Sequence, residues 1–395
     1  MSNPNVVFVS AVRTPIGTFG GALKDVSACE LGTIVVRAAL QRAGLAPHFA
    51  EALVMGNVIH SEARDMYVSR VSALQAGMPT ASTALTLNRL CGSGLQAIVT
   101  AANAIQLGEA EVTIGGGVET MSRALYAVSS SRWGARMGDA KLVDMMTGAL
   151  SDPFGAGHMG ITAENVAKKF GISRQAQDTF ALESQRRAVE AIEQGRFASQ
   201  IVPVEVKGRR GSVMFDEDEH PKKDTTLASL AKLKPAFNKE NGTVTAGNAS
   251  GLNDGAAACL LADESAAERL KLRPMARLVS YAVVGVEPSL MGTGPIPAVQ
   301  LALKRAGLRV DHLDVIESNE AFAAQALSVC HELGLDPDKT NPNGGAIALG
   351  HPLGASGAIL TVKCIHELQR TAGRYGLVTM CIGGGQGIAV VIERL

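Results

Sequence analysis

The stretch Asn88-Arg89-Leu90-Cys91-Gly92-Ser93-Gly94 joins a segment typical of a strand to a segment typical of a helix. Residues 83–87 before it are apolar and partly β-branched, and apolar residues recur at helical spacing over 95–105. A thiol at a helix N-terminus meets free N–H groups and the positive end of the helix dipole, and both lower its pKa. We therefore expect either a reactive thiol at Cys91 or a buried structural cysteine, which is the commonest state of a free thiol.

The composition indicates a large protein with an aliphatic core. The chain has 395 residues, of which 46% are hydrophobic but only 4% aromatic, and this length is enough for two or three domains. Its 43 glycines indicate many tight turns between strands and helices. Lys plus Arg equal Asp plus Glu at 37 each, so we expect neither a nucleic-acid nor a membrane partner.

The six cysteines are scattered, with no C-x-x-C pair and no Cys/His cluster at zinc-ligand spacing. We therefore expect reduced cysteines, no metal site and a cytoplasmic location. The N-terminus leads directly into a strand-like run at residues 6–10, so no signal segment is expected. The longest uncharged stretches are interrupted by proline, hydroxyl residues or glycine, so no membrane span is expected.

Two parts of the chain resemble each other, with several local matches in the same order at a nearly constant separation. The matched pairs are 38–45 with 301–308, 53–57 with 315–319, and 91–117 with 354–385. The first pair is typical of the ends of two amphipathic helices, stopped by Gly44 and Gly307. Chance similarity between alanine-rich helices is the alternative to a duplication. Strands alternate with helices in both parts, which predicts an α/β fold with largely parallel sheets and helical crossovers.

The duplication divides the chain into three expected parts. Residues 1–120 together with 252–273 form the N-terminal half, residues 121–251 form an insert, and residues 274–395 form the C-terminal half. The insert holds a long amphipathic helix at about 174–194 and a charged run at 216–224. Such a run is usually a solvated surface, which is our expectation here, although an insert that leaves the sheet near a reactive cysteine is also suited to cover a substrate.

Polar residues of the second half lie where the duplication places strand ends and a helix start. Asn319 ends one strand, His351 comes just before the helix that corresponds to the Cys91 helix, and Cys381 ends another strand. Each residue alone also has a purely structural explanation. Asn319 could be a turn residue, His351 a hydrogen-bonded polar side chain, and Cys381 a core cysteine. If the two halves pack together, their turns meet at a single site. The glycines after Cys381 lack G-x-G-x-x-G spacing and precede a strand, so a dinucleotide fingerprint is not indicated.

Four motifs together resemble the thiolase family. They are 88–94 around Cys91, Asn319-Glu320-Ala321-Phe322-Ala323, Gly350-His351-Pro352 and 381–387. The resemblance covers essentially the whole chain and is closest to bacterial acetyl-CoA acetyltransferases and broad-range β-ketothiolases. It implies the thiolase fold, with two pseudo-symmetric halves in a five-layer α-β-α-β-α stack, an inserted loop domain, and a homotetramer built as a dimer of dimers.

The resemblance also implies catalytic roles. Cys91 is the nucleophile that carries the acyl group as a thioester, and His351 is the base that activates it. Cys381 is the general acid/base at the substrate carbon, and we expect its pKa to be tuned towards neutrality. Asn319 holds a water that forms one oxyanion hole with His351, and the backbone N–H groups of Cys91 and Gly383 form the other.

Coenzyme A and acyl-CoA are implied as substrates, with no permanently bound cofactor and no metal. The implied CoA contacts are Leu150, His158, Met159, Lys222, Ser229, Ala246, Ser250, Met291, Ala321 and Phe322. Relatives commonly carry arginine where this chain has Lys222, and lysine lacks the planar group that stacks on adenine. His158-Met159-Gly160 resembles short-chain biosynthetic members, whereas Leu90 and Gln96 resemble broader-range enzymes.

The implied function is reversible Claisen condensation of acetyl-CoA with a short acyl-CoA, and thiolysis of 3-ketoacyl-CoA, through an acyl-Cys91 intermediate. The alternative is a mainly degradative 3-ketoacyl-CoA thiolase for longer chains, so polyhydroxyalkanoate-precursor synthesis and fatty-acid breakdown are both open. A ketoacyl synthase would carry Cys-His-His in place of the Asn319 and Cys381 motifs. A non-catalytic acyl-CoA binder would be expected to lack one motif, and a purely structural α/β protein needs none of them.

Overall fold

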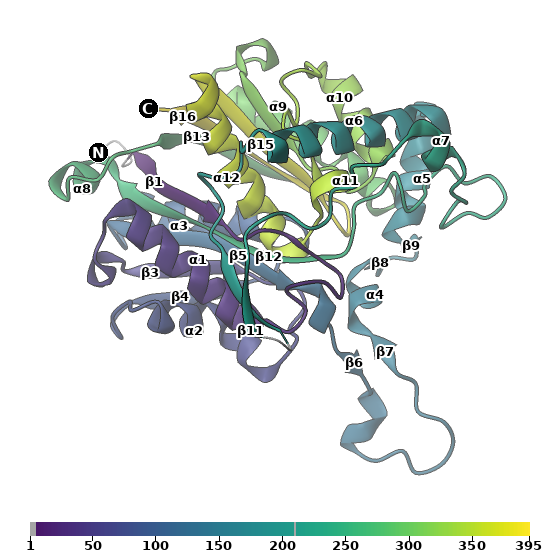
Figure 1. Ribbon diagram of the computed structural model, residues 1–395, viewed down its shortest axis with the longest axis horizontal. Coiled ribbons are helices and arrows are strands. Elements are labelled where there is room, and N and C mark those ends of the chain that lie inside the picture. Colours follow the sequence, from purple (N-terminus) through teal and green to yellow (C-terminus); the bar gives the residue numbers. More distant parts are fainter. Residues whose placement is uncertain (1–4, 209–210) are drawn as a thin grey trace.

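The computed structural model describes residues 5–208 and 211–395 (Figure 1). One mixed sheet runs through both halves of the chain. In the N-terminal half its strands lie side by side in the order β1 (Val6–Arg13), β12 (Asn253–Asp263), β5 (Val112–Thr120), β3 (Ala52–Gly56) and β4 (Thr83–Leu87), with the short β2 (Gly17–Thr18) paired to β12.

The C-terminal half repeats this order. Its strands are β13 (Ala276–Gly285), β16 (Gln386–Arg394), β15 (Tyr375–Ile382) and β14 (Val315–Ser318). The two sets join edge to edge where β1 pairs with β13, through Val7 with Arg277 and Phe8 with Ala276. The predicted duplication is therefore visible in the strand order itself.

The expectation of largely parallel sheets is wrong. β3 pairs in parallel with β4 and β5, and β14 pairs in parallel with β15, but β1, β12, β13 and β16 all pair antiparallel with their neighbours. In the second half a tight turn over residues 383–385 sends β16 straight back along β15. In the first half β12 returns along β5 only after the long insert, and in both halves the returning strand is antiparallel to the strand before it.

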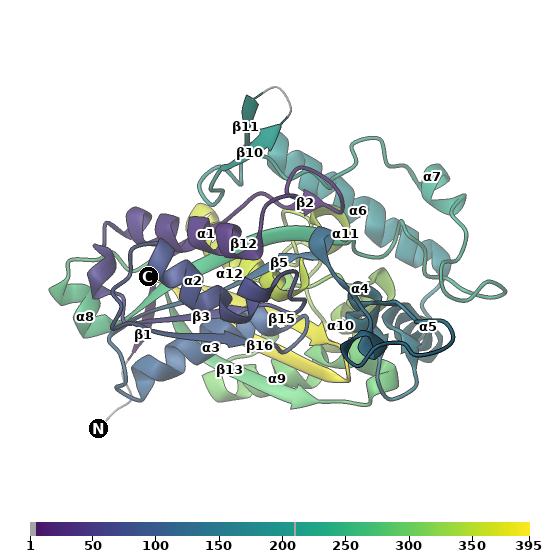
Figure 2. The ribbon, with the colours of Figure 1, turned by 90° about the horizontal axis from the view of Figure 1, so that it is seen from below.

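Helices complete five layers. α3 (Ser93–Gln106) and α12 (Leu353–Thr371) form the middle layer and pack against strands of both halves (Figure 2). α1 (Ala28–Ala43) and α2 (Val68–Gln75) cover the outer face of the first half, and α9 (Pro295–Ala306) and α10 (Ala323–Leu333) cover that of the second. This is the α-β-α-β-α stack expected from the family resemblance.

The matched helices end in the same way. α1 begins with a capping box between Ser27 and Glu30, and it stops at Gly44, whose φ is 66°. α9 stops at Gly307, whose φ is 67°. Glycine adopts this left-handed conformation without the strain that a side chain would add, so both predicted stop signals are confirmed.

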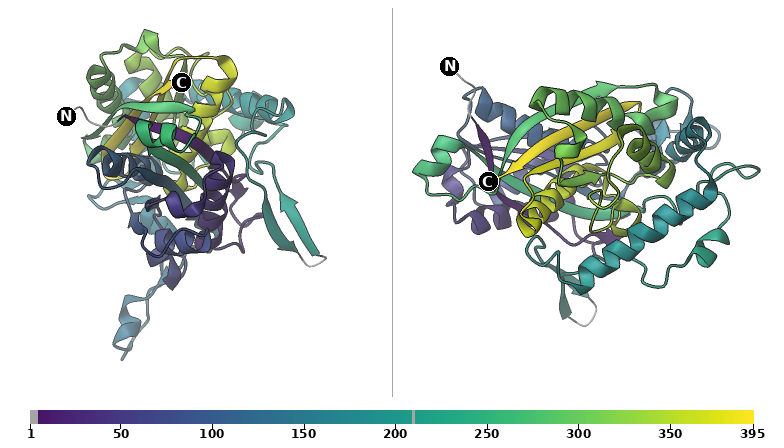
Figure 3. Two further views of the ribbon diagram at one scale, coloured as in Figure 1. Left: turned by 90° about the vertical axis from the view of Figure 1, so that its left-hand side faces the viewer. Right: turned by 90° about the horizontal axis from the view of Figure 1, so that it is seen from above.

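The segment between β5 and β12 contains its own short elements. They are β6 (Tyr126–Ala127), β7 (Val143–Asp144), α4 (Met145–Ala149), β8 (Ser151–Asp152), β9 (Gly157–His158), α5 (Met159–Phe170), α6 (Arg174–Glu193), β10 (Val204–Gly208), β11 (Gly211–Phe215) and α7 (Leu227–Ala231). α6 agrees with the predicted long helix. The β6–β7 arm and the β10–β11 hairpin project from the body, whereas α6 runs along its outside (Figure 3). The remaining helices are α8 (Glu264–Arg269) and α11 (Ala346–Leu349).

Within the described residues, none of the helices is both long enough and apolar enough to cross a bilayer.

The charged run at 216–224 is not simply a solvated surface, because Asp218 is buried. Its carboxylate accepts two hydrogen bonds from the Arg13 guanidinium, at 2.7 and 2.8 Å, and neither side chain has any exposed surface. Asp218 also accepts the backbone N–H of Ile16 at 2.8 Å. The solvated reading is therefore wrong at this position, where a carboxylate of the insert neutralises an arginine of β1.

Asp218→Ala is expected to destabilise the fold by about 3–5 kcal/mol, because it leaves the Arg13 guanidinium buried and unpaired. Urea denaturation of the purified protein measures this loss. Asp311→Ala is the control, since Asp311 pairs with Arg309 on an exposed turn and its removal should leave the midpoint unchanged. Equal midpoints for the two variants would contradict the role assigned to Asp218.

Candidate active site

Cys91 lies in a tight turn between β4 and α3. The residue before it, Leu90, has a φ of 47°, a strained value for a branched side chain. Two neighbours hold this conformation: the Leu90 N–H donates to Asn88 Oδ1 at 2.8 Å, and Ser93 Oγ donates to the Leu90 carbonyl at 2.7 Å. The predicted strand–turn–helix unit is confirmed, and the side chains of its own motif fix its shape.

The backbone around the Cys91 sulfur supplies hydrogen-bond donors. The N–H groups of Gly383 and of Cys91 itself bond to the thiolate form and favour it. Burial outweighs them and raises the pKa of Cys91 to about 11. The expectation that the helix N-terminus lowers this pKa is therefore wrong, because desolvation of the charge costs more than these dipoles return. Cys91 needs a base.

His351 lies just before α12 and is suited to act as that base. Its Nδ1 is 2.6 Å from Ser356 Oγ, and Ser356 in turn donates its hydroxyl hydrogen to the Pro352 carbonyl at 2.8 Å. The serine oxygen therefore accepts from Nδ1–H, which leaves Nε2 as the free basic nitrogen. Burial lowers the pKa of His351 to about 4, so the imidazole is neutral at pH 7.

Asn319 and Cys381 complete the group. Asn319 Nδ2 is 3.5 Å from His351 Nε2, and both side chains are buried. Cys381 lies near the end of β15, close enough to Cys91 for the charge of a Cys91 thiolate to act on it. Burial raises the pKa of Cys381 far above its ordinary value, and a Cys91 thiolate raises it further. The expected tuning of this thiol towards neutrality is thus wrong for the resting protein.

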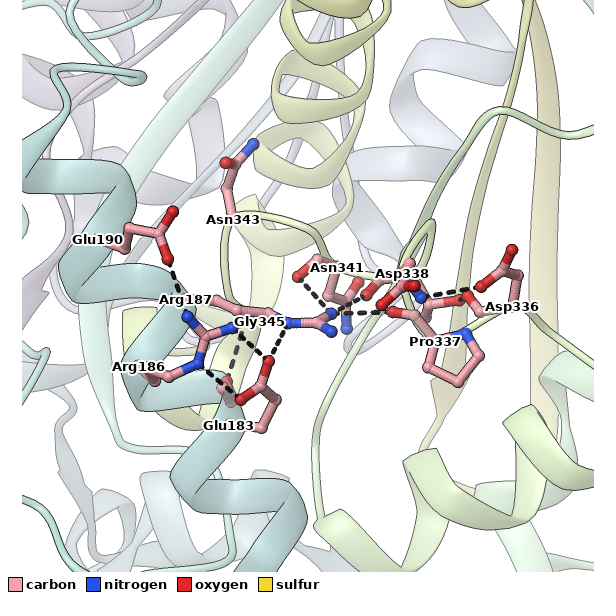
Figure 4. A network of polar contacts seen from close by, with 12 residues as sticks. Glu183, Arg186, Arg187, Glu190, Asp336, Pro337, Asp338, Asn341, Asn343 and Gly345 are labelled. Carbon is pink, nitrogen blue, oxygen red and sulfur yellow. Dashed lines mark hydrogen bonds and ion pairs between the residues drawn. The ribbon is translucent and has the colours of Figure 1, made fainter.

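A network of polar contacts holds the loop between α10 and α11 (Figure 4), and this loop bonds in turn to the end of β14, next to Asn319. Asn341 exchanges two hydrogen bonds with the backbone of Ser318, at 2.9 and 2.8 Å. Arg187 of α6 donates to the carbonyls of Pro337 and Thr340, at 2.9 and 2.7 Å, and its Nε donates to Glu183 at 2.7 Å. α6 therefore braces the loop between α10 and α11 from outside.

Four of the expected CoA contacts surround Cys381. Met159, Met291, Ala321 and Phe322 form one buried apolar cluster with it. Leu150 belongs to a second cluster that packs against Cys91. His158 stacks on Phe237 with ring centres 4.7 Å apart, and Phe237 meets the edge of Phe322. These residues make an apolar surround for the two thiols.

The other expected contacts lie on loops of the insert. Ser250 donates its N–H to the Ala321 carbonyl at 3.0 Å, and Ala246 is exposed on the same loop. Ser229 is exposed in α7, where it closes a capping box with Thr226. Lys222 is exposed on the preceding loop and donates its N–H to Gln185 of α6. Lys222 and Ser229 thus lie outside the cluster around the thiols.

Sequence reasoning missed two polar residues that position His351. Ser356 fixes the imidazole tautomer, and it lies near the start of α12, where side chains tilt back towards the N-terminus of the helix. Asn253 accepts the His351 N–H at 2.9 Å. Asn253 comes from β12 of the other half, so no local pattern identifies it.

Among the described residues, Cys29, Glu62 and Asp65 form a cluster with metal-ligand chemistry. Its donors are already engaged, because Asp65 accepts the N–H groups of Ser61 and Glu62 at 2.7 and 3.1 Å and the Cys29 thiol faces Asp65. The cluster lies away from both thiols of the site.

Two family models match the chain. The thiolase N-terminal domain covers residues 6–265 and the thiolase C-terminal domain covers residues 272–394. The chain belongs to the thiolase family. The resemblance inferred from the four motifs is therefore confirmed.

Similar thiolases include β-ketothiolase BktB of Cupriavidus necator, 62% identical over 99% of both chains, and acetyl-CoA acetyltransferase of Syntrophomonas wolfei, 49% identical over 99% of both. Among solved thiolase structures, human mitochondrial 3-ketoacyl-CoA thiolase matches with a TM-score of 0.97 and 47% identity over 99% of both chains. Bacillus anthracis acetyl-CoA acetyltransferase also gives 0.97 and 47%, over 100% of this chain and 99% of its own. The expected thiolase fold is confirmed.

The low pKa of His351 predicts a pH-dependent contribution to stability. In the unfolded chain the imidazole binds a proton below about pH 6.5, whereas in the fold it does so only below about 4. Acidification should therefore destabilise the wild type more than His351→Gln, by about 3 kcal/mol between pH 7 and pH 4. Urea denaturation at both pH values gives this difference. The exposed His331→Gln is the control, and a similar difference there would contradict the assignment.

Proposed function

We propose that this thiolase catalyses the reversible Claisen condensation of acetyl-CoA with a short acyl-CoA, and the thiolysis of 3-ketoacyl-CoA, through an acyl-Cys91 intermediate. The observation that supports it most is that the Cys91 turn of the first half meets Cys381 and the Gly383 N–H of the second, where Asn319 also lies beside His351. Thiolases named acetyl-CoA acetyltransferase and β-ketothiolase are among the similar proteins, which disfavours the longer-chain degradative alternative.

The first half-reaction transfers the acyl group to the enzyme. His351 Nε2 takes the proton of the Cys91 thiol, and the thiolate attacks the thioester carbonyl. Negative charge moves to the carbonyl oxygen, where the N–H groups of Cys91 and Gly383 stabilise it, each worth about 3–4 kcal/mol of the barrier. The carbon–sulfur bond to coenzyme A then breaks, and the CoA thiolate leaves with the proton held by His351.

The second half-reaction forms the carbon–carbon bond. Cys381, as thiolate, removes a proton from the methyl group of acetyl-CoA, and the enolate oxygen is stabilised by His351 and by a water on Asn319. Acylation of Cys91 prevents it from forming a thiolate, whose negative charge would otherwise raise the Cys381 pKa further. The carbanion attacks acyl-Cys91, the Cys91 thiolate is released, and the proton on Cys381 returns to it.

Coenzyme A and acyl-CoA are the proposed substrates, and no permanently bound cofactor or metal takes part in these steps. A solved human mitochondrial 3-ketoacyl-CoA thiolase in complex with CoA matches this chain with a TM-score of 0.96 and 47% identity, which supports CoA binding. In this proposal residues 121–251 form the covering domain between the halves 1–120 plus 252–273 and 274–395. The free state of all six cysteines is consistent with the cytoplasm as the proposed location.

Thiolysis of acetoacetyl-CoA and 3-ketovaleryl-CoA with free CoA tests the function directly. Cys381→Ala should still acquire an acyl group on Cys91, detected by mass spectrometry, but its condensation rate should fall by roughly 10²- to 10⁴-fold because the base at carbon is lost. Cys330→Ala, in α10 outside the site, is the matched control and should keep its rate. Normal condensation by Cys381→Ala would refute its role, and the absence of any thiolysis by folded wild type would refute the function.

A homotetramer built as a dimer of dimers is also proposed. β4 is an uncovered edge of the sheet, with Leu85 49% exposed, and the projecting arm carries Trp133 at 87% and Met137 at 97% exposure. Exposed strand edges and apolar patches of this kind mark contact surfaces between chains.

Light scattering should therefore give four times the 41.0 kDa mass of one chain. Leu85→Lys and Trp133→Ser should each give smaller assemblies, because they place a charge on the strand edge and remove the apolar tip of the arm. Leu107→Lys, at the exposed end of α3, should remain tetrameric. A wild-type monomer would contradict the proposal.

A further inference from the structure

Glu119, near the end of β5, is a fully buried carboxylate that the mechanism above does not use. One oxygen accepts from Asn57 Nδ2 at 3.2 Å and from the Ile59 N–H at 3.1 Å. The other accepts from the Val58 N–H at 3.1 Å and from the Gly354 N–H at 2.8 Å. All four partners are donors, and they come from both halves of the chain.

The contact with Gly354 joins Glu119 to the helix that follows His351. Gly354 lies in the first turn of α12, whose free N–H groups attract negative charge. A Cβ at Gly354 would lie 2.8 Å from the Val118 carbonyl and 2.9 Å from Glu119 Oε2, so only glycine permits this approach. The N-terminus of α12 is thereby fixed against β5 of the other half.

The internal duplication makes Glu119 the counterpart of Cys381. In the parallel pairs, Leu53 lies opposite Ile114 and Val315 lies opposite Gly376. Five residues further along each strand are Glu119 and Cys381, and each of these lies opposite a glycine of the next strand, Gly255 or Gly387. The same alignment carries Asn57 onto Asn319.

The two helix N-termini of the middle layer are therefore surrounded by equivalent positions with different side chains. At α3, Cys381 lies near the reactive Cys91, and Asn319 lies 3.5 Å from the His351 Nε2. At α12, Glu119 and Asn57 bond to each other, and Glu119 occupies the N–H group of Gly354. We call each of these helix N-termini, with the strand ends around it, a corner. The corner at α12 is filled by the carboxylate of Glu119.

We propose that Glu119 is a positioning residue for the reaction: its carboxylate bonds the first turn of α12 to the loop after β3 and so sets His351 against Cys91. The inference rests on the proposed roles of His351 and Cys91. Asn253, which belongs to the same half as Glu119, already accepts the His351 N–H. Glu119 adds a second fixed point at Gly354, three residues further along the same stretch of backbone.

The donor set explains why a carboxylate occupies this position. Burial raises the pKa of Glu119 to about 8, but Asn57 Nδ2 and the N–H groups of Ile59, Gly354 and Val58 all donate to its two oxygens, and this set of donors stabilises the ionised form. Glutamine would place its NH₂ group against at least one backbone N–H and leave that donor unpaired. Glu119→Gln is therefore nearly isosteric and yet breaks the contact.

The test compares steady-state kinetics of thiolysis for Glu119→Gln and Glu51→Gln. Glu51 is the matched control, because its carboxylate accepts the N–H groups of Glu111 and Val112 at the opposite, exposed end of β5. Glu119→Gln should lower kcat by roughly 10- to 100-fold with KM within about twofold, since misplacement by a fraction of an ångström suffices for such a loss. Glu51→Gln should match the wild type.

A double-variant comparison separates positioning from a general structural defect. In a His351→Gln background, Glu119→Gln should reduce the remaining rate by less than about twofold, because it acts through a group that is already absent. A wild-type kcat for Glu119→Gln, or an undiminished loss in the His351→Gln background, would overturn the inference.

If Glu119→Gln does not fold, Gly354→Ala tests the same contact by displacing the carboxylate instead of removing it. A loss of kcat in Gly354→Ala that disappears in the His351→Gln background supports the inference, and a wild-type kcat overturns it. Normal turnover by His351→Gln alone would instead overturn the proposed catalytic role of His351, which distinguishes that failure from a failure of Glu119.

Discussion

The close crossing of α3 and α12 in the middle layer is the constraint on which the rest of the structure depends. A Cβ at Gly94 would lie 2.8 Å from the Ala358 N–H nitrogen, and a Cβ at Gly357 would overlap the backbone of Leu95. Any larger residue at these positions would separate the helices. Because Cys91 and His351 each stand at the start of one of them, this backbone contact sets the distance between nucleophile and base.

Burial at this crossing also determines the resting charges of the site. The same desolvation that raises the pKa of Cys91 to about 11 lowers that of His351 to about 4, so both groups are neutral at pH 7. A thiolate–imidazolium pair in this place would cost free energy that only a substrate oxyanion, bonded to the waiting N–H groups, offsets. The backbone N–H groups of Cys91 and Gly383 are already in place, so they stabilise negative charge where it develops during the reaction. In the resting protein the thiols stay protonated.

Local signals in the sequence predicted what depends on neighbouring residues. The turn at 88–94, the helix stops at Gly44 and Gly307 and the long helix α6 all agree with the structure, because caps, turns and apolar spacing are encoded within a few positions. The internal repeat extended this to the order of the strands. It also placed His351 and Cys381 in one expected site.

Features that depend on distant partners were not predictable. The direction of β12 in the sheet depends on where the insert returns the chain. The spacing of apolar residues predicts a strand there but does not predict its direction. Asp218 looked like part of a solvated run because Arg13, which neutralises it, lies about two hundred positions away. The pKa of Cys91 was misjudged for a related reason, since the helix N-terminus is visible in the sequence but the apolar surround contributed by the second half is not.

Duplication by itself would build two equivalent corners, one at each helix of the middle layer, yet the side chains at these corners differ in kind. A thiol near Cys91 can accept and return a proton as a substrate comes and goes, so that corner must remain open. A carboxylate bonded to four donors has no free acceptor position to offer and keeps its corner closed. The rigid corner at α12 holds the imidazole in a fixed position while the thiols of the other corner react. A symmetric fold can therefore carry a single, asymmetric site.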